Sequence, residues 1–102
     1  MKHRIYNFLD KKLARDIAKL KKLGFAELDT YQPYSDRTYK LGKKSYTVAV
    51  WIDRSFNEKL QVIVQIDYYH FLGMSTMLAD GFICTKDNDI DELPEHVRLE
   101  YC

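Results

Sequence analysis

Residues 59–71 read KLQVIVQIDYYHF, and this stretch decides the fold. Successive side chains of a β-strand point to opposite faces of the sheet, so every second residue shares a face. One set is continuously apolar and consists of Leu60, Val62, Val64, Ile66 and Tyr68. The other set mixes polar and large apolar side chains and consists of Gln61, Ile63, Gln65, Asp67 and Tyr69. The stretch therefore predicts a long strand with one buried face and one face of mixed character.

The same two-residue period recurs on both sides of this strand. The predicted strands cover residues 25–31, 37–41, 45–53, 59–71 and 76–85. Pro33 favours a turn over residues 32–36, Gly42 favours a hairpin turn, and the pair Asp80-Gly81 indicates a bulge. The connections between these strands are short, which favours antiparallel pairing of neighbours.

A helical period precedes the strands. Apolar residues spaced three and four apart predict one helix over residues 8–23, and they are Leu9, Leu13, Ile17, Leu20 and Leu23. Gly24 fits the left-handed position that ends a helix, and Pro94 fits the start of a short final helix. The predicted fold is therefore α+β: an N-terminal helix packed on one face of a four- to five-stranded antiparallel meander sheet, with a short C-terminal helix. We expect a single α+β domain over residues 1–102.

The composition narrows the class of protein. The chain is 46% hydrophobic and 30% charged, which is typical of neither a disordered nor a membrane protein. Its apolar runs are far shorter than the roughly 20 residues of a transmembrane helix, so we predict no membrane contact. The N-terminal residues lack the apolar segment of a secretory signal. Cys84 and Cys102 are expected to be reduced thiols, which favours a cytoplasmic location.

The sequence contains no complete motif for catalysis or for metal binding. Residues 87–91 start like a calcium loop, but the glycine and glutamate that complete such a loop are missing. Cys84 with His70 as its base, and the carboxylates of Asp53 and Asp67, are the candidates for catalysis. Structural or solvated roles are the favoured interpretation of each. We therefore predict no metal, no cofactor and no catalytic residue, and the balance leans away from an enzyme.

The mixed face of the sheet is the first candidate binding surface, and its candidate residues are Trp51, Ile63, Gln65, Asp67 and Tyr69. Three interpretations fit it. The face is an ordinary solvated surface, an interface rich in aromatic residues, or the wall of a ligand pocket. Domains of the cystatin or nuclear-transport-factor type have the architecture that would form such a pocket, although architecture alone carries no function.

The N-terminal helix presents the second candidate surface, a basic stripe of Lys11, Arg15, Lys19 and Lys22. Such a stripe suits phosphate groups, but the solvated side of any amphipathic helix is charged as well. No nucleic-acid-binding motif accompanies it.

The function that these observations favour is a small non-enzymatic binding protein that uses the open sheet face. It would act as a homodimer or against a partner protein, as inhibitors and immunity proteins of this size do. The alternative is a small-ligand binder or a cavity enzyme with Asp67 as its base. The second alternative is a nucleic-acid-associated protein that uses the basic helix.

Overall fold

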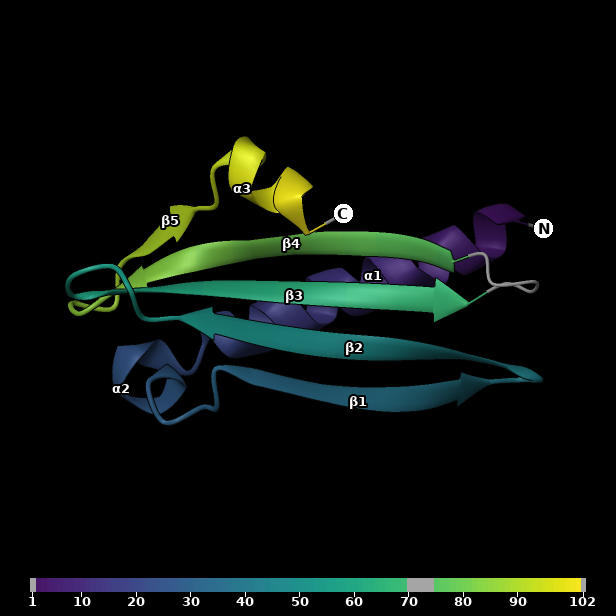
Figure 1. Ribbon diagram of the computed structural model, residues 1–102, viewed down its shortest axis with the longest axis horizontal. Helices are drawn as coiled ribbons and strands as arrows, with labels where there is room; N and C mark the ends of the chain where they lie inside the picture. The colour runs from purple at the N-terminus through teal and green to yellow at the C-terminus, as the bar shows by residue number, and fades with distance from the viewer. Residues whose placement is uncertain (1, 70–74, 102) are drawn as a thin grey trace.

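The computed structural model describes residues 2–69 and 75–101 (Figure 1). The helices are α1 (Lys2–Lys21), α2 (Gly24–Leu28) and α3 (Glu95–Glu100). The strands are β1 (Tyr34–Leu41), β2 (Lys44–Asp53), β3 (Lys59–Tyr69), β4 (Ser75–Thr85) and β5 (Ile90–Glu92). The predicted α+β fold is confirmed. His70, the predicted strand end at residues 70–71 and Cys102 lie outside the described residues.

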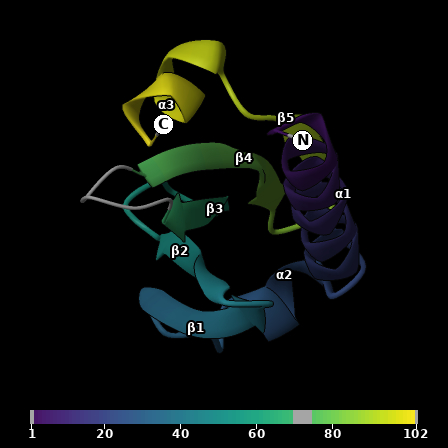
Figure 2. The same cartoon turned by 90° about the vertical axis from the view of Figure 1, so that its right-hand side faces the viewer.

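The strands form one antiparallel sheet in the order β1-β2-β3-β4-β5. Helix α1 lies against one face of the sheet and packs on β3 and β4. Helix α3 lies on the other side of β4, as Figure 2 shows. The sheet is therefore covered by a long helix on one face and by a short helix on part of the other.

The hydrophobic core forms between α1 and the face of the sheet that the alternation predicted. The apolar set of β3 is buried there, together with Tyr46, Val48 and Ile52 of β2. The apolar stripe of α1 faces the same layer, and Leu9, Leu13, Ile17 and Leu20 are buried in it. The periods of 2 and 3.6 thus identified the two surfaces that meet.

Helix α1 begins earlier than the predicted start at residue 8. Its first turns are held by side chains that the apolar stripe does not include. The Tyr6 hydroxyl lies 3.4 Å from Oγ1 of Thr76, and the Phe8 ring meets the Tyr46 ring edge-on at 5.8 Å between centroids.

Among the described helices, none combines the length and the apolar character needed to cross a lipid bilayer.

The predicted strand over residues 25–31 is wrong, because this segment contains helix α2. Gly24, with φ of +81°, turns the chain after α1. The Asp29 N–H donates to the Phe25 carbonyl at 2.9 Å, and Leu28 is fully buried in the core. The Phe25 N–H donates to Oδ1 of Asn88 at 2.8 Å, so a loop distant in sequence satisfies the free end of this helix.

The predicted bulge is also wrong, because β3 and β4 pair one for one through Asp80 and Gly81. A Cβ atom on Gly81 would lie 2.0 Å from the Val62 carbonyl oxygen, so glycine here permits a close approach of two backbones. The fifth strand comes instead from residues 90–92, which overlap the segment that starts like a calcium loop and pair with residues 82–84 of β4.

Candidate functional site

The five residues predicted on the open face come from β2 and β3 and share the side of the sheet that faces away from α1. In the register, Trp51 lies opposite Ile63, and Gln65 lies opposite Ala49. Asp67 lies opposite Thr47 on β2 and opposite Met77 on β4. The structure thus brings the predicted residues onto one surface, with Trp51 and Ile63 towards one end of it and Asp67 and Tyr69 towards the other.

Helix α3 covers the first end of this face. The Tyr101 ring lies 5.9 Å from the Trp51 ring between centroids. Gln65 accepts a hydrogen bond from the Trp51 indole at 3.3 Å, and its own amide donates to the Tyr101 carbonyl at 2.7 Å. Ile63 is only 1% exposed. This end is therefore packed by the chain's own C-terminal segment, and the accessible part of the face begins beyond Gln65.

The accessible part of the face is centred on Asp67. Two large side chains stand beside it with high exposure, namely Tyr69 at 50% and Met77 at 42%. Tyr34, which is 43% exposed, lies opposite Trp51 at the other end of the face. The Tyr69 hydroxyl donates to Oδ2 of Asp67 at 3.2 Å. The Tyr34 ring packs against the Trp51 ring at 4.4 Å between centroids. We name the surface formed by Asp67, Tyr69 and Met77 the Asp67 patch.

The carboxylate of Asp67 is incompletely satisfied. Its Oδ1 atom is shielded from solvent and accepts no hydrogen bond from any described residue. The ion pairs between described residues join Arg54 to Asp29, Lys12 to Asp16 and Arg98 to Glu95. Asp67 takes part in none of them. The shielded Oδ1 is closed to outside donors, but the carboxylate charge has no cation beside it among the described residues, so a cation brought close to it by another molecule would be stabilising.

Neighbouring carboxylates raise the pKa values of two tyrosines on this face, Tyr69 and Tyr34. The charge of Asp67, and then its hydrogen bond, raise the pKa of Tyr69 above the ordinary value of 10.0. The pKa of Tyr34 is raised first by its hydrogen bond to Oδ2 of Asp36 at 2.9 Å, then by desolvation and by the charge of Asp36, and least by the charges of Tyr69 and Asp67. Tyr34 therefore responds chiefly to Asp36 on its own strand, whereas Tyr69 responds to Asp67.

This environment gives a testable pH dependence. We expect Asp36→Asn to lower the pKa of Tyr34, because the amide removes the negative charge that disfavours the phenolate. In the wild-type protein the raised pKa values mean that the folded state holds these protons more tightly than the unfolded state. Their contribution to stability is therefore full below pH 10 and is lost as the pH rises through the folded-state values.

The measurement is an absorbance titration of the phenolates at alkaline pH, with Asp67→Asn as the second variant. Asp67→Asn should lower the pKa of Tyr69 most, and Asp36→Asn that of Tyr34. Identical titration curves for the wild-type protein and both variants would contradict the proposed proximity.

Tyr34 and Asp36 were missed in the sequence, which assigned them to a turn around Pro33. The Pro33 carbonyl instead accepts the Ile52 N–H at 2.9 Å, so the β1–β2 ladder already begins there. The alternation of Tyr34, Asp36 and Thr38 was the available signal. Met77 was also missed, although it lies opposite Asp67 on the mixed face.

The basic stripe lies on the other side of the sheet from the Asp67 patch, with three residues on α1 and Lys22 in the turn after it. All four of its residues, Lys11, Arg15, Lys19 and Lys22, are exposed. Lys19 also borders an apolar groove of about 450 Å³ between α1 and the first two strands, together with Arg37. The stripe and the Asp67 patch are thus separate surfaces of opposite charge.

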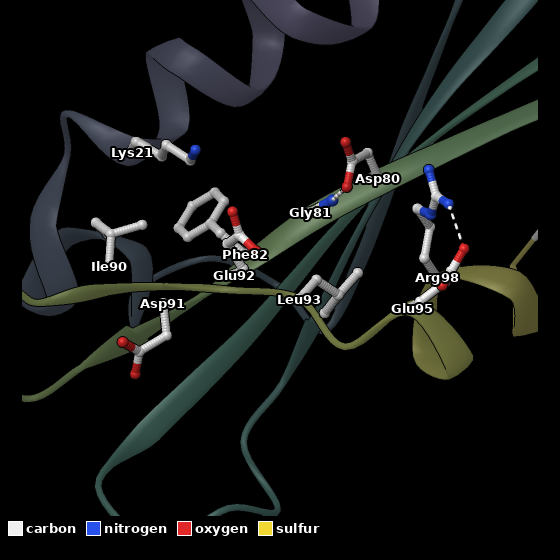
Figure 3. A pocket seen from close by; sticks show the side chains of 10 residues that line it. All are labelled: Lys21, Asp80, Gly81, Phe82, Ile90, Asp91, Glu92, Leu93, Glu95 and Arg98. Atoms are coloured by element: carbon white, nitrogen blue, oxygen red, sulfur yellow. Dashed lines mark hydrogen bonds and ion pairs between the residues drawn. The ribbon is translucent and has the colours of Figure 1, made fainter.

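A second groove, shown in Figure 3, lies between the end of α1, strands β4 and β5, and α3. Its volume is about 450 Å³, and both acidic and basic side chains line it. Arg98 is paired with Glu95 at 3.4 Å. Among the described residues, no group of three histidine, cysteine or acidic side chains is placed to hold a metal ion.

The candidates for catalysis are not brought together within the described chain. Cys84 is buried on the core side of β4, and burial raises the pKa of its thiol, which opposes reactivity. Asp53 lies opposite Gln61, at the far end of the strands from Asp67, and its Oδ1 accepts hydrogen bonds from Ser55.

Comparison of the chain with protein-family models, with curated proteins and with solved structures finds no match.

Proposed function

We propose that the chain is a non-enzymatic binding protein that takes a basic segment of a partner protein on the Asp67 patch. The observation that carries the proposal is the Asp67 carboxylate. It lacks an ion-pair partner among the described residues, has one oxygen without a hydrogen-bond donor, and lies beside the exposed side chains of Tyr69 and Met77.

The chemistry of the patch suits arginine or lysine. A guanidinium group can stack on the exposed face of Tyr69 and can donate to Asp67 at the same time. Tyrosine, tryptophan and methionine are enriched in interfaces, and aromatic and arginine anchors carry most of the energy there. The Tyr69 hydroxyl already holds the Asp67 carboxylate in place, so little side-chain freedom is lost on binding.

The alternatives find less support at this surface. A two-fold contact through the patch would bring the Asp67 carboxylates of two copies together, which disfavours a homodimer of that form. A ligand pocket beside Trp51 is disfavoured because Tyr101 already packs there. Nucleic-acid binding by the basic helix remains an untested prediction.

The buried free thiol of Cys84 supports the cytoplasmic location that we propose with this function.

A titration of ¹⁵N-labelled protein tests the proposal, with acetyl-Gly-Arg-Gly-amide as the probe and acetyl-Gly-Glu-Gly-amide as its control. We expect saturable shifts at the Asp67, Tyr69 and Met77 amides with the arginine peptide only. Asp67→Asn should abolish these shifts.

The matched control is Asp53→Asn, because Asp53 is an acid of the same face at its other end. It should leave the titration unchanged. Arginine-induced shifts centred on residues 86–92, or shifts that persist in Asp67→Asn, would overturn the proposal.

A further inference from the structure

Strand β1 forms a free edge of the sheet. Within the part of the chain that the structure describes, β2 is its only hydrogen-bonded neighbour. Figure 1 shows it along the lower border of the sheet, with nothing beyond it. It is eight residues long, whereas β5 at the opposite end has three. A long unpaired edge is a template for another strand, and natural proteins either protect it or use it.

The ladder determines which backbone groups are free. The Ile52 N–H donates to the Pro33 carbonyl, which makes these two residues a hydrogen-bonded pair. Such pairs alternate along an antiparallel ladder, so the odd-numbered residues of β1 bond to β2. The N–H and C=O groups that point outward belong to Tyr34, Asp36, Thr38 and Lys40.

The side chains of this edge are complementary to themselves in one register. If a second copy pairs antiparallel about a two-fold axis through Thr38, Asp36 lies opposite Lys40 of the second copy. Arg37 then lies opposite Tyr39 of the second copy, and each of these contacts occurs twice. Opposite charges and cation–aromatic pairs across strands each contribute to pairing. Within one chain the Arg37 guanidinium already lies 5.7 Å from the Tyr39 ring centroid.

The neighbouring registers lack this complementarity. An axis through Arg37 places two guanidinium groups opposite each other, and an axis through Asp36 does the same with two carboxylates. An axis through Tyr39 places Thr38 opposite Lys40 and leaves Asp36 without a basic partner. Like charges directly opposite each other are destabilising, so the register about Thr38 is the favoured one.

The groove beside this edge fits the same arrangement. Helix α1 packs on β3 and β4, which leaves an apolar groove over β1 and β2 with Ser35, Val48 and Val50 in its lining. The register about Thr38 places Leu41 of the second copy opposite Ser35, at the rim of this groove. An apolar side chain of the second copy can therefore cover part of the exposed apolar surface.

We propose that two copies of the chain associate through β1, antiparallel and centred on Thr38, to form one continuous sheet. This inference is independent of the Asp67 patch, which the pairing leaves uncovered on the face of the sheet. The dimer would display two such patches on the same side.

Charge reversal at the two paired positions tests the proposal, with native mass spectrometry and analytical ultracentrifugation as readouts. Wild-type protein should be a dimer. Asp36→Lys and Lys40→Asp should each raise the dissociation constant at least about tenfold, because each creates like-charge pairs across the axis. The double variant Asp36→Lys/Lys40→Asp restores both pairs and should dimerise like the wild type. The exposed Lys11→Asp variant is the control and should stay dimeric.

Cross-linking tests the register directly. In a Cys102→Ser background, Thr38→Cys should form a disulfide between copies, since directly opposed residues of a hydrogen-bonded pair have Cα atoms about 5.5 Å apart. Ser35→Cys should not, because its counterpart is Leu41 of the second copy. A monomeric wild-type protein would overturn the proposal and would mean that Arg37 and Lys40 protect the edge. A double variant that stays monomeric while folded, as circular dichroism reports, would overturn it as well.

Discussion

We expect Gly81→Ala to lower the free energy of unfolding by at least about 3 kcal/mol, which is the upper part of the range for overpacking an interior. The added Cβ would lie 2.0 Å from the Val62 carbonyl oxygen and 3.1 Å from the Cα of Ile63. Both obstacles are backbone atoms of the central strand, so neither can swing away as a long side chain could. The strands must separate locally, which breaks ladder hydrogen bonds between β3 and β4.

Gly42→Ala is the matched control for this prediction. Gly42 has φ of +65°, but an added Cβ would meet nothing within 4 Å. Its replacement should therefore cost only the backbone strain of about 1–2 kcal/mol. Urea denaturation of the two variants and the wild type measures the difference. Equal losses at both positions would show that the close approach of β3 and β4 at Gly81 is not as described.

Phe82→Ala should lower the free energy of unfolding by about 3–5 kcal/mol. The ring is 1% exposed and lies on the core side of β4, where the Lys21 ammonium group approaches it at 5.8 Å from the centroid. Its removal leaves a cavity in the core between α1 and the sheet. The same urea measurements give the value.

Met77→Ala is the control on the same strand, because Met77 points to the opposite face and is exposed. We expect a change within about 0.5 kcal/mol, as is usual for surface positions. A large loss at Met77 together with a small loss at Phe82 would mean that the two faces of β4 are assigned the wrong way round.

The local periods of the sequence predicted most of the fold. The alternation in β2 and β3 identified the buried face, because one residue of shift would have turned every apolar side chain to solvent. The spacing of Leu9, Leu13 and Ile17 likewise identified the buried side of α1. These signals are local, and they remained valid because the packing agrees with them.

The parts that were mispredicted depend on contacts between distant residues. Gly24–Leu28 form helix α2, in which the Phe25 N–H is satisfied by Asn88, and no local pattern reveals this contact. Strand β5 has three residues and pairs with β4 only because the turn after Thr85 returns the chain to it. In the candidate site, Asp67 and Tyr69 were predicted, but the cover of Trp51 by Tyr101 depends on where α3 docks.

The central claim is that the Asp67 patch binds a basic segment, and an unbiased peptide selection tests it most directly. A random peptide library is selected on the wild-type protein and counter-selected on the Asp67→Asn/Tyr69→Phe variant. We predict that the retained peptides share an arginine or lysine next to an apolar residue, and that they bind the variant at least about tenfold more weakly. Retained peptides that are acidic, or that bind the variant as well as the wild type, would contradict the claim.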